Sequence, residues 1–142
     1  MLEWVIKACQ RSAHYINKGE RGISTDVAIL VPTGDKLANQ YKHRRDVYVV
    51  EGDEDDVLSR YVKAAEQFKP NFIVRITSDC PLIPPNVITK HITLVTKYRY
   101  DYISNVNEKV RMSPDGWDCE VLSMNMLEWA NENTKDREHV TI

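Results

Sequence analysis

The sequence is poor in the features that mark several specialised classes of protein. It has only three cysteines, Cys9, Cys80 and Cys119, an odd number at wide spacing, which fits neither a disulfide framework nor a paired Cys-x-x-Cys zinc site. Its 19 basic and 21 acidic residues give a formal net charge of −2. The chain therefore has no general electrostatic attraction to nucleic acid or to an anionic membrane surface, and local groups must hold any phosphate ligand.

Long apolar runs are also missing. The longest covers residues 27–31 and ends before Pro32, whereas a membrane-spanning helix needs about 20 apolar residues. An acidic residue, Glu3, lies in the first segment, which has no apolar stretch typical of a signal peptide. We expect a cytoplasmic protein that binds neither membrane nor nucleic acid.

Short β-prone runs alternate with segments of helical periodicity along most of the chain. Helices are expected over about residues 2–18, 34–44, 57–68 and 87–95, and strands over 27–31, 47–50, 72–76 and 102–103. This alternation predicts a single α/β domain, with a doubly wound, mainly parallel sheet and helices on both faces. Strands over 110–112 and 117–122, followed by a helix over 124–133, predict a small β-rich C-terminal extension.

In an open parallel sheet the ligand crevice lies beyond the carboxyl ends of the strands. The strand over 72–76 delivers Ser78 and Asp79 to this edge, and three prolines between residues 81 and 85 stiffen the exit. Mg²⁺ takes few protein carboxylates and keeps its other positions for water and phosphate oxygens, so one rigid aspartate suits a nucleotide–metal site. Alternatively, Asp79 only caps the following turn, and spacing alone does not decide between the two.

The acidic segment 51–61 superficially resembles a calcium-binding loop, but it lacks the ligand alternation and the distal glutamate of an EF-hand. Capping of the following helix by Asp53 or Asp55 is the favoured interpretation. Ser59 and Arg60 could still point into the crevice.

A further set of polar residues lies towards the C-terminus. On a strand over 117–121, Asp118 and Glu120 share one face and could jointly meet a metal ion or a sugar hydroxyl. Glu138 and His139 are also candidates, although a histidine is more often a surface or core residue and Glu138 could simply pair with a neighbour.

Five segments together carry a resemblance to a known family. They are GDEDDVLSRYVKAA (52–65), VRITSDCPLIPP (74–85), DYISN (101–105), DGWDCEVLS (115–123) and DREHVT (136–141). In this order they resemble the cytidylyltransferases of the spore-coat polysaccharide type. These enzymes are relatives of the CMP-Kdo and CMP-sialic acid synthetases, in the nucleotide-diphospho-sugar transferase superfamily. Five blocks in the family's order are a far more specific signal than any single motif.

The resemblance implies a reaction and a set of residue roles. CMP would pass from CTP to a sugar acid or a sugar phosphate in surface polysaccharide biosynthesis, with release of pyrophosphate. Asp79 would hold Mg²⁺ on the CTP phosphates, and Asp118 would be a second catalytic carboxylate near the metal or sugar. The other implied site residues are Ser59, Arg60 and Ser78 near the nucleotide, and Asn105, Glu120, Glu138 and His139 near the substrate.

Two departures from the family pattern qualify this expectation. Family members begin with a strand and a basic, glycine-containing loop that holds the CTP phosphates, and the sequence starts after that loop. We therefore expect an N-terminally truncated domain with little or no transferase activity in these 142 residues alone. In the segment 114–117, the family usually has a basic residue before the glycine and an aliphatic one after it, where this chain has Asp115 and Trp117.

Two other functions remain open at this point. One is a catalytically inactive sugar-nucleotide-binding or assembly module of the same fold, with a possible homodimer through the C-terminal region. The other is a metal-dependent glycosyltransferase. Those enzymes usually present an Asp-x-Asp pair at the strand end, where this chain has Ser78-Asp79-Cys80.

Overall fold

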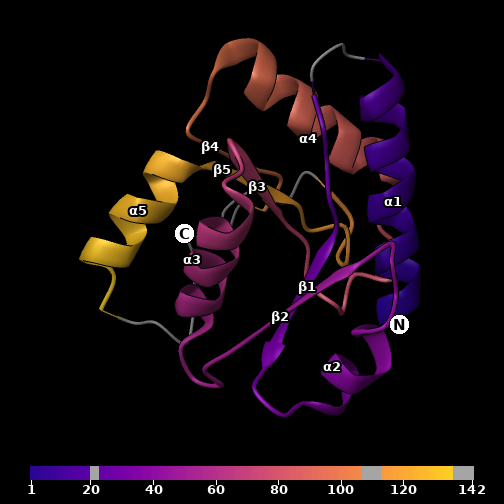
Figure 1. Cartoon of the computed structure of the whole chain (residues 1–142). Helices are drawn as coiled ribbons and strands as arrows, with labels where there is room; N and C mark the ends of the chain where they lie inside the picture. The colour runs from indigo at the N-terminus through magenta and orange to yellow at the C-terminus, as the bar shows by residue number, and fades with distance from the viewer. Residues whose placement is uncertain (20–22, 107–112, 136–142) are drawn as a thin grey trace. The chain divides into compact units, whose positions relative to one another are not determined.

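The computed structural model describes residues 1–19, 23–106 and 113–135 (Figure 1). Contacts within the backbone divide the chain into two compact units, each made of two separate segments. The first unit comprises Met1–Thr25 and Phe72–Ser123, and the second comprises Asp26–Asn71 and Met124–Ile142. The expectation of a single domain stays a prediction.

The first unit is a three-stranded sheet with two helices. Its elements are α1 (Leu2–Gly19), β3 (Phe72–Arg75), α4 (Pro85–Tyr98), β4 (Tyr102–Ser104) and β5 (Glu120–Ser123). The strand order is β3-β5-β4, and β5 runs antiparallel to both neighbours. Because β5 has a strand on each side, all four of its residues are buried.

Helices α1 and α4 pack against each other, and α4 also contacts β4 and β5 (Figure 1). The apolar residues of α1 recur at three- and four-residue steps, so they lie on one face of the helix. A hydrogen bond of 2.9 Å joins Ser12 Oγ of α1 to Thr89 Oγ1 of α4 within this interface. The buried core of the unit contains Ala8, Ile16, Cys80, Ile83, Ile88, Ile92 and Cys119. Two of the three cysteines are therefore core residues.

The second unit is built on a pair of parallel strands. Its elements are β1 (Ala28–Pro32), α2 (Lys36–Tyr41), β2 (Tyr48–Gly52), α3 (Val57–Phe68) and α5 (Met124–Asn133). Helices α2 and α3 pack against β2, and α3 also contacts α5. Asp35 caps α2, and its carboxylate accepts a hydrogen bond of 2.7 Å from the Leu37 amide.

The α/β class predicted from the sequence is confirmed, with parallel pairing between β1 and β2, and the predicted helix over 124–133 has the same bounds in the structure. The β-rich C-terminal extension needs correction. The segment expected as a strand over 117–122 forms β5 over Glu120–Ser123, which is the central strand between β3 and β4. Its expected partner, 110–112, lies outside the described residues.

In the part of the chain that the structure describes, no helix combines the length and the apolar character that a membrane span requires.

Candidate functional site

Five of the sequence-predicted site residues lie at or next to one end of the β3-β5-β4 sheet. Glu120, the first residue of β5, is paired with Arg75, the last residue of β3, and with Ser104, the last residue of β4. The chain therefore leaves β3 and β4, and enters β5, at the same end of the sheet. Ser78 and Asp79 follow β3, Asn105 follows β4, and Asp118 precedes β5.

Asp79 lies in a turn after β3 and is exposed, as is Ser78. The Cys80 amide donates to the Thr77 carbonyl over 3.2 Å, which closes the turn. A hydrogen bond from the Thr77 side chain is the main cause that lowers the pKa of the Asp79 carboxyl, aided by its own backbone amide, the Cys80 thiol and the positive charge of Arg75, while burial opposes it. The Asp79 carboxylate is thus ionised at neutral pH. Asp79 belongs to a turn, and its side chain is exposed to solvent, where its oxygens could bind a cation.

Asp118 is partly buried in an extended segment just before β5. It follows a turn in which the Trp117 amide donates to the Pro114 carbonyl over 3.2 Å, and Gly116 adopts a φ of 81° that favours glycine. The prediction that Asp118 and Glu120 share one face of a strand over 117–121 is wrong, because the strand begins only at Glu120.

Asn105 forms hydrogen bonds with the segment that carries Asp118. Its Nδ2 donates to the Trp117 carbonyl over 2.7 Å and to Ser113 Oγ over 3.2 Å, and its Oδ1 accepts from the Cys119 amide over 2.8 Å. Both amide hydrogens and one acceptor position are therefore used within the chain. The predicted contact between Asn105 and a substrate stays a prediction.

Glu120 is buried, and its carboxylate belongs to a network of three residues. One carboxylate oxygen pairs with Arg75 Nη1, and the other accepts a hydrogen bond of 2.6 Å from the Tyr102 hydroxyl. The side chains of Glu120 and Arg75 are 8% and 25% exposed. In the described structure Glu120 thus binds its own chain, while its predicted role in substrate binding stays untested.

The network changes the pKa of the Tyr102 hydroxyl, which can be measured. Burial, together with the hydrogen bond to Glu120, raises the pKa of Tyr102 to about 12. A tyrosine whose folded pKa is raised stabilises the fold below its unfolded pKa of about 10, and this stabilisation is lost as the pH rises towards 12. We expect the phenolate absorbance of the protein minus that of Tyr102→Phe to titrate at about pH 12. A difference spectrum that titrates near pH 10 would contradict the network.

Ser59 and Arg60 lie in the second unit, in the first turn of α3. Asp56 is the N-cap of this helix, and its carboxylate accepts a hydrogen bond of 2.8 Å from the Ser59 amide. The prediction of Asp53 or Asp55 as the cap is therefore wrong. Asp53 instead accepts hydrogen bonds of 2.9 Å from the amides of Asp55 and Asp56, which organises the turn before the cap.

The side chain of Arg60 packs against Gly52 at the carboxyl end of β2. A Cβ added at Gly52 would stand 2.8 Å from Arg60 Cγ, which is closer than real carbon atoms approach. We expect Gly52→Ala to displace Arg60 and to lower the free energy of unfolding by about 1–3 kcal/mol, measured by urea denaturation. Gly19→Ala is the control, since nothing lies within 4 Å of a Cβ there. Equal free energies of unfolding for the two variants would show that the packing of the Arg60 side chain does not require a glycine at position 52.

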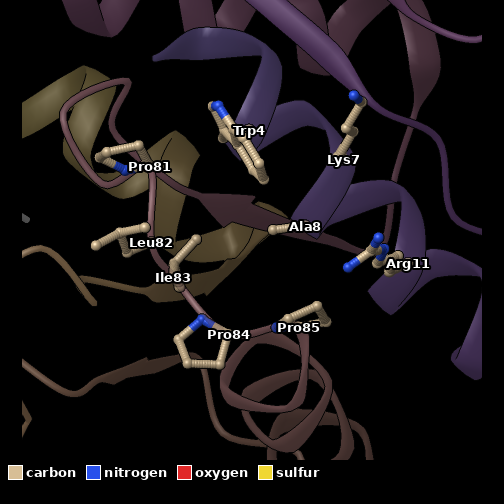
Figure 2. A pocket seen from close by; sticks show the side chains of 9 residues that line it. All are labelled: Trp4, Lys7, Ala8, Arg11, Pro81, Leu82, Ile83, Pro84 and Pro85. Carbon is tan, nitrogen blue, oxygen red and sulfur yellow. The ribbon is translucent and has the colours of Figure 1, made fainter.

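A cavity of about 230 Å³ lies in the first unit between α1 and the loop before α4 (Figure 2). Trp4, Lys7, Ala8 and Arg11 line it from α1, residues 81–84 line it from the loop, and Pro85 lines it from the start of α4. Asp79 is not among these residues. The sequence analysis missed Lys7 and Arg11, although their spacing of four residues places both on one face of the helix with Trp4.

Glu138 and His139 lie outside the described residues, and the possible homodimer through the C-terminal region stays a prediction.

The carboxylates at the end of the sheet fit the ligand chemistry of Mg²⁺. Mg²⁺ prefers oxygen ligands and binds through one or two carboxylates together with water and phosphate oxygens. Asp79 and Asp118 supply two such groups near the same strand ends, and the pKa of Asp79 is lowered. Within residues 1–19, 23–106 and 113–135, no group of three or more His, Cys, Asp or Glu side chains is arranged so that it could hold a metal ion.

Comparisons with known proteins identify the family of the chain and do not test the roles of these residues. The model of the cytidylyltransferase family matches residues 1–137. An uncharacterized protein of Methanocaldococcus jannaschii is 38% identical over 98 residues, which cover 67% of this chain and 38% of that protein. The spore coat polysaccharide biosynthesis protein SpsF of Bacillus subtilis is 29% identical over 131 residues, covering 89% of this chain and 50% of SpsF.

Among solved structures, a cytidylyltransferase from Leptospira borgpetersenii serovar Hardjo-bovis has a similar fold, with a TM-score of 0.78 at 24% identity. The match covers 98% of this chain and 57% of that one. The chain thus spans half or less of the two sequence relatives and a little over half of the structural one.

Proposed function

Because this chain belongs to the cytidylyltransferase family, we propose that it serves the transfer of CMP from CTP to a sugar acid or a sugar phosphate, with release of pyrophosphate. The observation that carries the proposal is the position of Asp79 and Asp118, which lie near the strand ends at one end of the same sheet. Nucleotidyl transfer depends mainly on positioning and on neutralising phosphate charge, which two fixed carboxylates with a shared cation can provide.

In this proposal Asp79 and Asp118 hold Mg²⁺. When bound, the ion would supply the positive charge that neutralises the triphosphate. The carboxylates fix the position of the ion, and the turn around Asp79 limits the movement of that ligand before substrate arrives. Ser78, next to Asp79 and exposed, is proposed to contact the nucleotide.

Positive charge on the chain supports the choice of anionic substrates. Lys7 and Arg11 are exposed on α1 and line the cavity beside residues 81–85 (Figure 2). We propose that they attract the phosphates or the acidic acceptor. Ser59 and Arg60, at the start of α3, remain proposed nucleotide contacts of the second unit.

The place in metabolism is part of the proposal. SpsF bears a name that refers to spore coat polysaccharide biosynthesis, and we propose that this chain also serves the activation of a sugar for a surface polysaccharide. Membership of the cytidylyltransferase family favours nucleotidyl transfer over a glycosyltransferase reaction.

The experiment measures binding and turnover separately. Calorimetry with CTP, UTP, ATP and GTP, each with and without Mg²⁺, gives the nucleotide preference, and a pyrophosphate-release assay with a panel of sugar acids and sugar phosphates gives the acceptor. We expect Mg²⁺-dependent binding that favours CTP, and we expect any release of pyrophosphate to require an acceptor. Binding with no preference for CTP, or release of pyrophosphate without an acceptor, would contradict the proposal.

A further inference from the structure

Asn105 stands out among the residues at the end of the sheet because its side chain bonds to the backbone on both sides of one residue. Nδ2 donates to the Trp117 carbonyl, which belongs to the peptide group before Asp118. Oδ1 accepts from the Cys119 amide, which belongs to the peptide group after Asp118. A planar carboxamide thus holds the two peptide planes that flank the Asp118 Cα.

The orientation of these two planes determines the φ and ψ angles of Asp118, and with them the direction of its Cα–Cβ bond. The β4–β5 ladder ends at the pair Ser104 and Glu120, after which one longer backbone bond of 3.3 Å runs from the Asn105 amide to the Cys119 carbonyl. Beyond that point the side chain of Asn105 continues the pairing that the backbone no longer makes.

Two further features anchor the segment that Asn105 binds. Cys119 is fully buried, and its thiol packs in the core of the first unit, so one end of the segment is anchored. The third bond of Asn105, from Nδ2 to Ser113 Oγ, ties the start of the turn that leads to Asp118 to the same side chain. Asn105 therefore joins the strand end, the turn and the aspartate through three hydrogen bonds.

From this geometry we propose that Asn105 is a positioning residue, which fixes the backbone of Asp118 and with it the direction of the Asp118 side chain at the end of the sheet. The proposal rests on the metal-binding role proposed above for Asp118, and the substrate contact predicted for Asn105 from the sequence stays a separate prediction. Only an amide supplies the required donor and acceptor at this reach. An aspartate would oppose the Trp117 carbonyl with a second acceptor, and an alanine would remove both bonds.

Two measurements test this proposal: the hydrogen-exchange rate of the Cys119 amide reports on the backbone, and the affinity for Mn²⁺ reports on the metal site. In Asn105→Ala, amide hydrogen exchange of Cys119, followed by NMR in the whole chain, should accelerate about tenfold because the amide loses its acceptor. Asn105→Asp keeps an acceptor for this amide but loses the donor to Trp117, so its exchange should rise less, and it serves as the second variant if the alanine substitution prevents folding. The control is Ser123→Ala, which removes a hydrogen bond of 2.7 Å to Asp101 at the other end of β5 and should leave Cys119 unchanged.

Mn²⁺ affinity in the presence of CTP, measured by electron paramagnetic resonance, completes the test. If Asn105 acts through Asp118, both Asn105→Ala and Asp118→Asn weaken Mn²⁺ binding, and the double variant is no weaker than Asp118→Asn. Additive losses would overturn the proposal, because Asn105 would then act on the ligand independently. An unchanged Cys119 exchange rate in Asn105→Ala would overturn it as well.

Different results would contradict the metal role of Asp118 and the positioning role of Asn105. If Asp118→Asn keeps full Mn²⁺ affinity, the proposed metal role of Asp118 is contradicted, and the exchange rate of Cys119 then decides by itself whether Asn105 holds the segment.

Discussion

Asp79→Asn is expected to weaken the Mg²⁺-dependent binding of CTP by at least about tenfold. Substitution of groups that only hydrogen-bond to the direct ligands of a metal already lowers metal affinity by about tenfold to a hundredfold. The substitution keeps the size of the side chain and removes the charge. Asp79 is exposed, and its pKa is lowered chiefly by the hydrogen bond from Thr77, so the wild-type side chain is an ionised ligand at neutral pH. Isothermal titration calorimetry with and without Mg²⁺ measures the loss.

The control for this experiment is Asp46→Asn. Asp46 is also an aspartate near the surface, but it pairs with Arg44 over 2.6 Å within the segment between α2 and β2. We expect its substitution to leave CTP binding unchanged. If Asp79→Asn binds CTP with the same Mg²⁺ dependence as wild type, Asp79 is only a turn residue and the proposed metal site is wrong.

Arg75→Ala is expected to lower the free energy of unfolding by about 3 kcal/mol, at the lower end of the range for removing one partner of a buried ion pair. The variant leaves the buried carboxylate of Glu120 with Tyr102 as its remaining described hydrogen-bond donor. The lower end applies because the Arg75 side chain is 25% exposed, which lets solvent share in the interaction. Urea denaturation followed by circular dichroism gives the value.

A paired replacement separates the charge from the packing. Arg75→Met combined with Glu120→Leu removes both charges and retains apolar volume, so it should recover most of the stability lost in Arg75→Ala. The interpretation fails if Arg75→Ala lies within about 0.5 kcal/mol of wild type, the range of ordinary surface substitutions.

The alternation of elements could be predicted because it depends on local signals. Apolar periodicity located α1 and α3, and the expected helix over 124–133 matches α5 residue for residue. The partner of β5 could not be predicted in this way. A short strand after a glycine-containing turn suggests a local hairpin, whereas β5 pairs with β4, the strand before it in the chain, and with β3, which lies much earlier in the sequence.

The candidate site shows the same division. The position of Asp79 just after the end of β3 could be predicted from the order of the elements along the chain. The roles of Glu120 and Asn105 depend on partners that only the fold brings near. Arg75 and Tyr102 occupy the carboxylate of Glu120, and the backbone beside Asp118 occupies the amide of Asn105. Residue type alone could not separate ligand-binding groups from groups that hold other groups in place.

Paramagnetic broadening by Mn²⁺ in the presence of CTP can show whether Asp79 and Asp118 bind one divalent ion, because Mn²⁺ accepts the same oxygen ligands as Mg²⁺. We predict that the backbone amide resonances of Asp79 and Asp118 broaden together at low Mn²⁺ concentration, and that excess Mg²⁺ restores both. Broadening elsewhere in the chain while both of these resonances stay sharp, or broadening of only one of them, would contradict a single divalent ion shared by the two carboxylates.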